Sequence, residues 1–123
     1  MEKGQLYGVF IERAAVQLGI EIFLRYDEAR QFVSACQNAG MAILGIDGVR
    51  IDSRQVMPYI DAIADYSPTR VLEWDEYRDR CNRLALEFLR QAAAEKGADT
   101  CFCFEVLDHA EYVDCLKKIA VAR

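Results

Sequence analysis

The sequence has few of the residues and patterns that carry recognisable chemistry. Its 123 residues include one histidine and one tryptophan, and no C-x-x-C pair occurs. Zinc sites usually combine such a cysteine pair with a second pair or with histidines, so no zinc site is expected. The glycine spacing of the nucleotide-binding fingerprints is also missing. We therefore expect no catalytic residue, no metal and no cofactor.

Long hydrophobic runs and an excess of positive charge are missing as well. No window approaches the ~20 apolar residues of a membrane span, and acidic residues interrupt the first segment, which therefore does not resemble a signal peptide. Lysine and arginine number 15 against 20 aspartates and glutamates, a formal net charge of −5. Because such a chain repels polyanions, we expect it to bind neither nucleic acid nor a membrane.

The cysteines are odd in number. They are Cys36, Cys81, Cys101, Cys103 and Cys115. An odd count without a signal sequence predicts reduced thiols and a cytoplasmic protein. A free cysteine behaves as a small buried hydrophobe, and we interpret all five as structural.

Two helices follow from apolar residues spaced three and four apart. They cover about residues 26–40 and 74–96. Asp27 is the expected N-cap of the first helix, and Gly40 and Gly97 are the expected ends of the two helices. A capping box, Asp108-x-x-Glu111, predicts a further helix at the end of the chain.

Strand signals lie between and after these helices. Four segments alternate or are rich in β-favouring residues: 20–25, 41–46, 49–52 and 100–106. Asp47-Gly48 predicts a tight turn between the second and third. Residues 1–18 fit either a helix or a strand. The expected fold is a single α+β domain over residues 1–123, with a largely antiparallel sheet of about four strands and helices packed on one face.

An acidic segment between Asp47 and Asp79 is the most informative feature for function. It holds eight acidic residues against four arginines, with tyrosines and a tryptophan interleaved. The segment is either an ordinary solvated face or a docking surface for a basic protein. It has no EF-hand spacing for a cation. The candidate partner-binding residues are Asp47, Asp52, Asp61, Asp65, Tyr66 and Glu73.

His109 is the remaining candidate for acid–base chemistry. It follows Asp108 at the start of the last predicted helix, where the helix dipole disfavours a charged imidazole. A dyad with Cys101 or Cys103 would need a third, orienting group, and the sequence identifies none. We interpret His109 as a surface residue at a helix start.

The order of several short motifs resembles a known group of proteins. A helix ending in NAG precedes AILGIDGVRID, MPYIDAIADYS, EWDEYRDRCNRLALEFL and CFCFEVLD. This succession, over about Asp27 to Asp108, resembles small bacterial proteins that include immunity proteins of polymorphic-toxin systems. The shared features are an ILGxDGxxx strand pair, a P…DxxxDYS segment, a W-x-x-[YA] helix and an [FY]-F-E-[IV]-[LV] strand. The resemblance implies an inhibitory binding protein rather than an enzyme.

Three hypotheses follow for the function. The first is an immunity protein that neutralises a basic toxin domain by masking its active site, since acidic inhibitors are steered toward cationic sites. The alternative is a self-associating structural or regulatory domain, a homodimer formed through a strand edge or the helix that begins at Trp74. A small enzyme working through carboxylates is the least favoured, because no nucleophile–base pair is visible.

Overall fold

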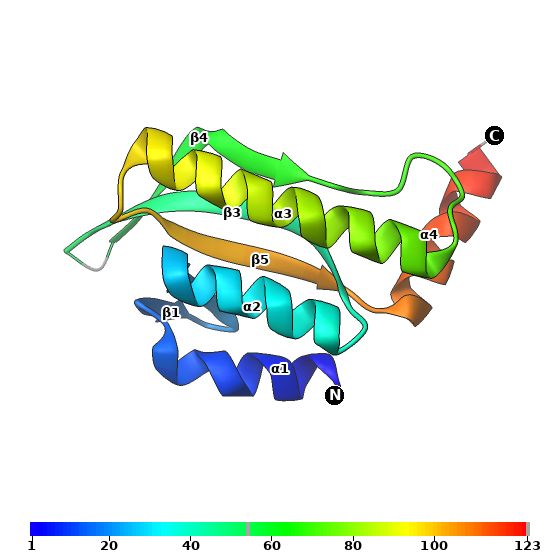
Figure 1. Cartoon of the computed structure of the whole chain (residues 1–123), viewed down its shortest axis with the longest axis horizontal. Helices are drawn as coiled ribbons and strands as arrows, with labels where there is room; N and C mark the ends of the chain where they lie inside the picture. Colours follow the sequence, from blue (N-terminus) through cyan, green and yellow to red (C-terminus); the bar gives the residue numbers. More distant parts are fainter. Residues whose placement is uncertain (54, 123) are drawn as a thin grey trace.

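One antiparallel sheet organises the computed structural model, which describes residues 1–53 and 55–122, with side chains up to residue 119 (Figure 1). In these residues the sheet has five strands, in the order β1-β2-β5-β3-β4. Their bounds are β1 (Val16–Leu18), β2 (Glu21–Arg25), β3 (Ala42–Asp52), β4 (Gln55–Asp65) and β5 (Cys101–Leu107). The last strand of the chain thus lies in the middle of the sheet, between the two hairpins β1–β2 and β3–β4.

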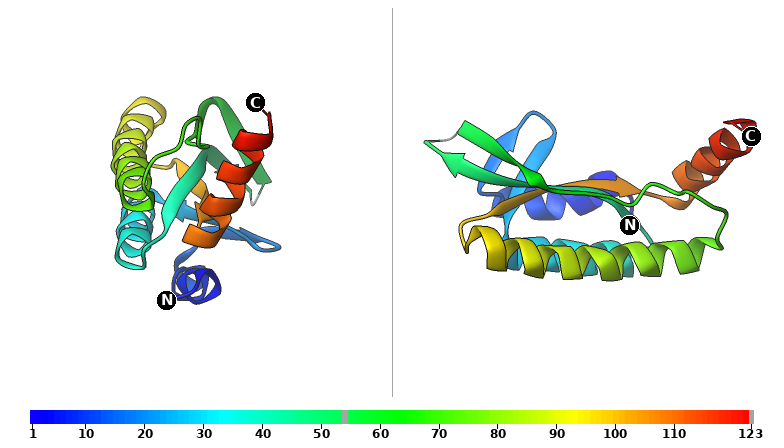
Figure 2. Two further views of the ribbon diagram at one scale, coloured as in Figure 1. Left: turned by 90° about the vertical axis from the view of Figure 1, so that its right-hand side faces the viewer. Right: turned by 90° about the horizontal axis from the view of Figure 1, so that it is seen from above.

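The helices cover the sheet unevenly. They are α1 (Lys3–Phe10), α2 (Tyr26–Asn38), α3 (Trp74–Lys96) and α4 (His109–Ala122), with a short 3₁₀ turn, η1 (Ile11–Arg13), after α1. α2 and α3 lie side by side on one face, whereas α1 lies along the margin of the sheet and α4 projects from one end (Figure 2). The α+β class is confirmed, with a fifth strand and with only two helices sharing a face. No described helix is both long enough and apolar enough to cross a membrane.

Local sequence signals account for the ends of most helices. Gly40 has φ +72° after α2, and the Met41 N–H donates to the Cys36 carbonyl at 2.8 Å, as expected for a glycine-terminated helix. The Asp108–Glu111 capping box is present, with both reciprocal hydrogen bonds formed. The expected N-cap Asp27 was wrong by two positions. Arg25 is the N-cap, and Asp27 lies in the first turn, where its charge still favours the helix dipole.

The predicted turn at Asp47-Gly48 is wrong, because both residues lie inside β3. β5 pairs with β3 through this stretch, so that Asp47 faces Cys103 across the ladder. Gly48 is explained by close packing. A Cβ at this position would lie 2.9 Å from the Ala62 Cβ atom, nearer than side-chain carbons approach. Long-range pairing on both sides of β3 thus overrides a strong local turn signal.

β4 was missed because two features hide its strand pattern. Pro58 lies within it, and proline is tolerated only at the edge of a sheet because it has no N–H to donate. A bulge also breaks the alternation. β3 advances two residues from Asp47 to Val49, whereas β4 advances five residues between their partners, from Pro58 to Ile63. Most of the acidic segment's first half is therefore strand rather than loop.

The first eighteen residues contain both of the alternatives that the sequence left open. α1 comes first, with Leu6 and Phe10 buried, and the short strand β1 follows it. The Tyr7 ring packs edge-on against Phe32 of α2, and its hydroxyl donates to the carbonyl of Phe104 at 3.0 Å. α1 is therefore fixed beside β5 by both apolar and polar contacts.

Asn82 is a buried polar residue on the core-facing side of α3, and the apolar periodicity gave no indication of it. Its side chain is 4% exposed. The amide oxygen accepts from the Ile43 N–H at 2.9 Å, and the amide nitrogen donates to the Met41 carbonyl at 2.9 Å and to Gln37 Oε1 at 2.7 Å. One amide thus joins α3, the end of α2 and the beginning of β3.

Replacing Asn82 by alanine should destabilise the fold strongly. The Ile43 N–H and the Met41 carbonyl would lose their partners, and each buried unpaired group costs about 1–3 kcal/mol, so we expect a loss of about 2–5 kcal/mol in the free energy of unfolding. Urea denaturation followed by circular dichroism measures this. The control is Asn38→Ala, because the Asn38 side chain is exposed and should change stability by less than about 0.5 kcal/mol. Equal effects of the two substitutions would contradict the role given to Asn82.

Candidate functional site

The face of the sheet opposite α2 and α3 is open in its middle. Along β5, Phe102 and Phe104 point to the helices and pack in the main core, whereas Cys103 and Glu105 point to the open face. An apolar cluster under the strand hairpins covers one end of this face, and at the other end Ala42 and Leu107 pack with residues of α4 and of the first half of α3. Between these two ends lies a groove of about 990 Å³, which we call the sheet groove.

The floor of the sheet groove consists of two cross-strand rows of residues. In one row Gly45 of β3 lies between Asp65 of β4 and Glu105 of β5. In the next row Asp47 of β3 lies between Ile63 and Cys103. Directly paired residues of an antiparallel sheet point to the same face, so these side chains project together into the groove. Because Gly45 has no side chain, the Glu105 carboxylate lies over it, with one oxygen 3.6 Å from the position that a Cβ would occupy.

The walls of the sheet groove come from the margins of the fold. Lys3, Gly4 and Tyr7 of α1 line one side, and Glu111 of α4 lines one end. Ile20, in the turn between β1 and β2, lies on the rim and is 93% exposed. Together with Ile63, which is 56% exposed, it gives the groove apolar contact points that no part of the described chain covers.

Negative charge dominates the sheet groove. Five acidic residues line it: Glu21, Asp47, Asp65, Glu105 and Glu111. Lys3 is the one basic residue among the described residues of the lining, and its ammonium lies 2.6 Å from a Glu111 carboxylate oxygen. The remaining carboxylates make no ion pair within the part of the chain that the structure describes. The groove therefore presents a negative field to an incoming ligand.

The two predicted site residues in the groove are Asp47 and Asp65. Asp47 is exposed in the middle of the floor. One Asp65 carboxylate oxygen accepts from both the N–H and the hydroxyl of Ser67, which lowers the pKa of Asp65. That carboxylate stays charged at neutral pH, and its second oxygen is free of hydrogen bonds within the described residues.

Three other predicted residues lie outside the groove. Asp52 forms an ion pair with Arg50 near the end of β3 at 2.7 Å. Asp61, in the bulge of β4, binds Lys96 at 2.6 Å, and this hydrogen bond lowers the pKa of Asp61. Glu73 precedes α3 as its N-cap residue. Closeness in sequence therefore does not make the acidic segment one surface.

Tyr66, the predicted aromatic contact residue, is half-buried and engaged within the chain. Its hydroxyl donates to the Leu84 carbonyl at 3.2 Å, and its carbonyl accepts from the Tyr77 hydroxyl at 2.7 Å. Burial, with smaller contributions from Cys81 and Glu87, raises the pKa of Tyr66 to about 12. These contacts hold the segment after β4 against α3, so we leave Tyr66 out of the candidate site.

Glu21, Glu105 and Glu111 belong to the groove but were not among the predicted residues. Glu105 is the only charged residue in the strand segment CFCFEVL, and Glu111 was noticed only as part of a capping box. A charged residue in an otherwise apolar central strand is a sequence signal for an open face, and it could have identified Glu105. Nothing in the sequence places Glu21 near either of the other two residues.

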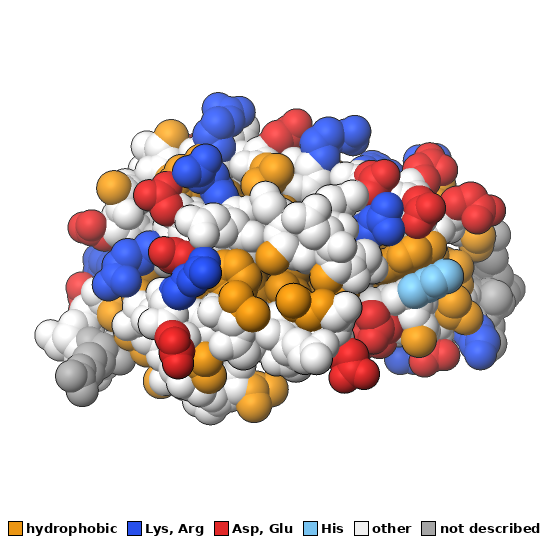
Figure 3. Space-filling model, turned by 60° about the horizontal axis from the view of Figure 1, so that its bottom comes forward, with side chains coloured by type: hydrophobic (Ala, Val, Ile, Leu, Met, Phe, Trp, Pro, Cys, Tyr) orange, Lys and Arg blue, Asp and Glu red, His pale blue; other side chains and the backbone are white. Residues whose placement is uncertain are grey.

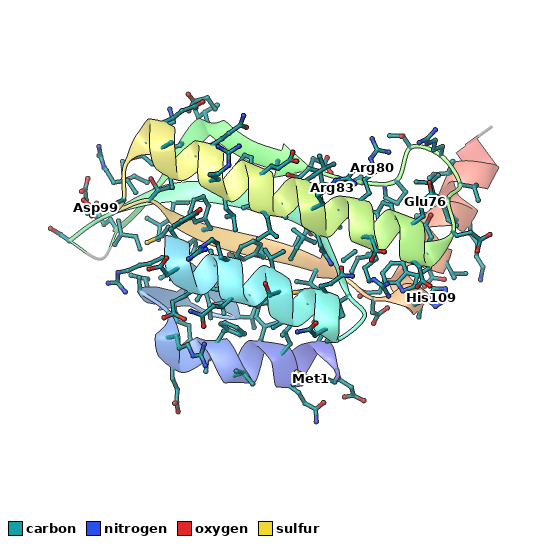
Figure 4. All side chains as sticks on the ribbon, in the orientation of Figure 1. Met1, Glu76, Arg80, Arg83, Asp99 and His109 are labelled. Atoms are coloured by element: carbon teal, nitrogen blue, oxygen red, sulfur yellow. The ribbon has the colours of Figure 1, made fainter. Side chains whose placement is uncertain are left out.

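His109 is exposed at the start of α4, as expected. Its ring stacks on Trp74, with ring centroids 5.3 Å apart and an interplanar angle of 4°. Figure 4 shows it beside the first turn of α3, and Figure 3 shows the ring lying on hydrophobic side chains with acidic groups nearby. Among the described residues, no hydrogen bond joins His109 to a cysteine, since the Cys101 and Cys103 thiols donate to Asp99 and Glu21.

All five cysteines are free, and four of them are buried. Burial raises the pKa of the Cys103 thiol to about 12. The hydrogen bond that this thiol donates to the Glu21 carboxylate, at 3.4 Å, also raises it. Burial also raises the pKa of Cys36. Among the described residues, no group of three or more histidine, cysteine, aspartate and glutamate side chains is placed to hold a metal ion.

The native protein should react slowly with thiol reagents. Only Cys115 is half-exposed, so at most one thiol should react quickly with Ellman's reagent at pH 8, and five should react after denaturation. Cys115→Ser should remove the fast phase. Fast reaction of two or more thiols in the native protein would contradict the burial described here.

No family model matches this chain, and no curated protein matches it.

Proposed function

We propose that this chain is a small binding protein of the immunity type, which neutralises a basic bacterial toxin domain through protein–protein contact. The sheet groove is the surface that carries the proposal. It combines five acidic residues with two exposed isoleucines, on the face that α2 and α3 leave open. Apolar contact points within a charged surface are typical of transient protein interfaces.

Electrostatics favours a basic partner over other ligands. Lys3 is the only cation of the described groove lining, and it is paired with Glu111. A cationic surface, such as the active site of a toxin that acts on nucleic acid, would meet complementary charge across the whole groove. Such complementarity speeds association and suppresses wrong partners. The same charges disfavour nucleic acid as the direct ligand.

A reducing compartment fits the proposal. Each of the five cysteines is free and four are buried, which matches a protein that works in the cytoplasm, where disulfides are rare. An immunity protein against a toxin that attacks nucleic acid would act in that compartment. Binding rather than catalysis is the proposed activity.

The test begins with the gene next to the one that encodes this chain. If that neighbour encodes a toxin domain, expressing the toxin alone should arrest bacterial growth, and co-expressing this chain should restore it. Growth arrest that persists with well-expressed, folded protein would contradict the immunity role, as would a neighbouring gene that encodes a metabolic enzyme.

Charge reversal in the groove should slow association with that toxin domain. Asp47→Lys with Glu105→Lys reverses two floor charges, and we expect association about tenfold slower at low salt, since steering depends on the local field. Stopped-flow kinetics measures the rate. The matched control, Asp52→Lys with Glu73→Lys, changes the net charge equally outside the groove. Equal slowing by both pairs would show that net charge acts without a defined face.

Self-association is the second candidate, and one observation favours it. β4 is an edge strand whose Ile60 is 88% exposed. However, Pro58 and the bulge reduce the regular pairing that this edge offers to a second copy. Light scattering at high protein concentration, with Ile60→Lys as the comparison, shows whether the chain forms a dimer. A dimer that Ile60→Lys dissociates supports this alternative, and a monomer removes it.

A further inference from the structure

We infer that a basic segment of the partner enters the sheet groove beside α1, and that Lys3 occupies the place that a partner's arginine or lysine takes in the complex. This inference rests on the proposed function in using the same face of the sheet. It adds an entrance formed by α1. It also adds the replacement of the Lys3–Glu111 ion pair by an ion pair between Glu111 and the partner.

The entrance follows from incomplete pairing along β5. β2 pairs only with Cys101 and Phe102 of β5, and further along that edge Tyr7 of α1 contacts the Phe104 carbonyl. Continued pairing would place Ile22 of β2 opposite Phe104, but the Phe104 carbonyl accepts from the Tyr7 hydroxyl instead. The groove is accordingly lined by Lys3, Gly4 and Tyr7 of α1 together with Cys103–Leu107 of β5.

Gly4 keeps the entrance wide. It lines the groove from α1, is exposed, and has no heavy atom within 4 Å of the position that a Cβ would occupy. On the floor opposite, the Glu105 carboxylate lies over Gly45, with one oxygen 3.6 Å from the position that a Cβ would occupy there. A cationic side chain that enters past Gly4 therefore meets the Glu105 carboxylate on the floor.

Lys3 marks the kind of group that the groove accepts. Its ammonium binds Glu111 at 2.6 Å between α1 and α4, while 35% of its side chain and 43% of that of Glu111 remain exposed. A partly exposed ion pair of this kind contributes little stability, about 0–1 kcal/mol, so an arriving cation can replace it. Glu111 would also keep its hydrogen bond from the Asp108 N–H.

The occupant is a peptide segment rather than a small molecule. A groove of about 990 Å³ with acidic residues from five different elements suits several cationic side chains, and a single one would leave most carboxylates without a counter-charge. The exposed Ile20 and Ile63 suit the apolar parts of arginine and lysine stems or their neighbours. Charge complementarity thus selects an arginine- or lysine-bearing segment.

The test uses a fluorescein-labelled ten-residue peptide of alternating arginine and serine, titrated by anisotropy at low ionic strength. Its control replaces arginine by citrulline, which has the same shape without the charge. Gly4→Phe should weaken binding at least about tenfold by filling the entrance. Gly8→Phe is the matched control, because Gly8 is also exposed on α1 with open space around it but does not line the groove.

Lys3→Ala should strengthen peptide binding. This second variant keeps the inference testable if Gly4→Phe fails to fold. Removing the internal cation frees Glu111, so we expect peptide binding up to about fivefold tighter, the equivalent of an exposed ion pair. Lys118→Ala removes the same charge from α4 outside the groove and should change Kd by less than about twofold. Amide chemical shifts should move at Gly45 and Glu105 when the peptide binds.

The outcomes separate this inference from the proposed function. Equal Kd values for the Gly4 and Gly8 variants, or equal effects of the two lysine variants, would overturn the inference, as would shift changes confined to the acidic first turn of α3. Peptide binding that follows the expected pattern in a protein that neutralises no toxin would support the groove and remove the immunity role. If the Gly4→Phe variant still neutralises the toxin, the immunity role is supported and the entrance beside α1 is removed as the binding site.

Discussion

The hydrogen bonds of the buried Asn82 amide hold the two helices of the main core in position on one face of the sheet. They connect α3 to Gln37 at the end of α2 and to Met41 and Ile43 at the start of β3. The two helices are thus held as one layer, in a fixed position against the central strands. Buried amides that satisfy backbone groups impose a particular arrangement, because any shift leaves polar groups unpaired. Since both long core helices are fixed to one face, the middle of the opposite face stays open.

The sheet groove depends on a second constraint, the incomplete pairing of β2 with β5. Only Leu24 and Arg25 of β2 pair with β5, the rest of β2 pairs with β1 alone, and α1 is attached to the edge of β5 through Tyr7. At the other margin β4 pairs with β3 from Gly45 to Asp52, with a bulge. The open face is therefore bounded by a helix on one side and an edge strand on the other. A groove between unlike walls follows from this pairing pattern, with no separate loop or insertion.

Sequence reasoning succeeded where structure is decided locally. The core-facing residues of α2 and α3, the left-handed Gly40 and the capping box that opens α4 were all predictable, because their physics lies within a few residues. It failed where pairing between strands distant in sequence determines the local structure. Asp47-Gly48 has a strong hairpin preference, yet pairing with β5 keeps it extended, and Pro58 hides a strand that tolerates it only at the sheet edge. The polar Asn82 was overlooked because its partners come from distant segments.

The same distinction explains why the acidic site was only partly predictable. The groove takes one acidic residue from each of five elements, from Glu21 of β2 to Glu111 of α4, and no two are neighbours in sequence. A single carboxylate on a strand is an ordinary solvated residue. Strand pairing places Asp65, Asp47 and Glu105 on adjacent rows of one face, where their fields add. By contrast Asp61, close to Asp65 in the chain, lies in the bulge and binds Lys96 instead. The charge that selects a basic partner is therefore a property of the sheet register, and a change in that register would disperse it.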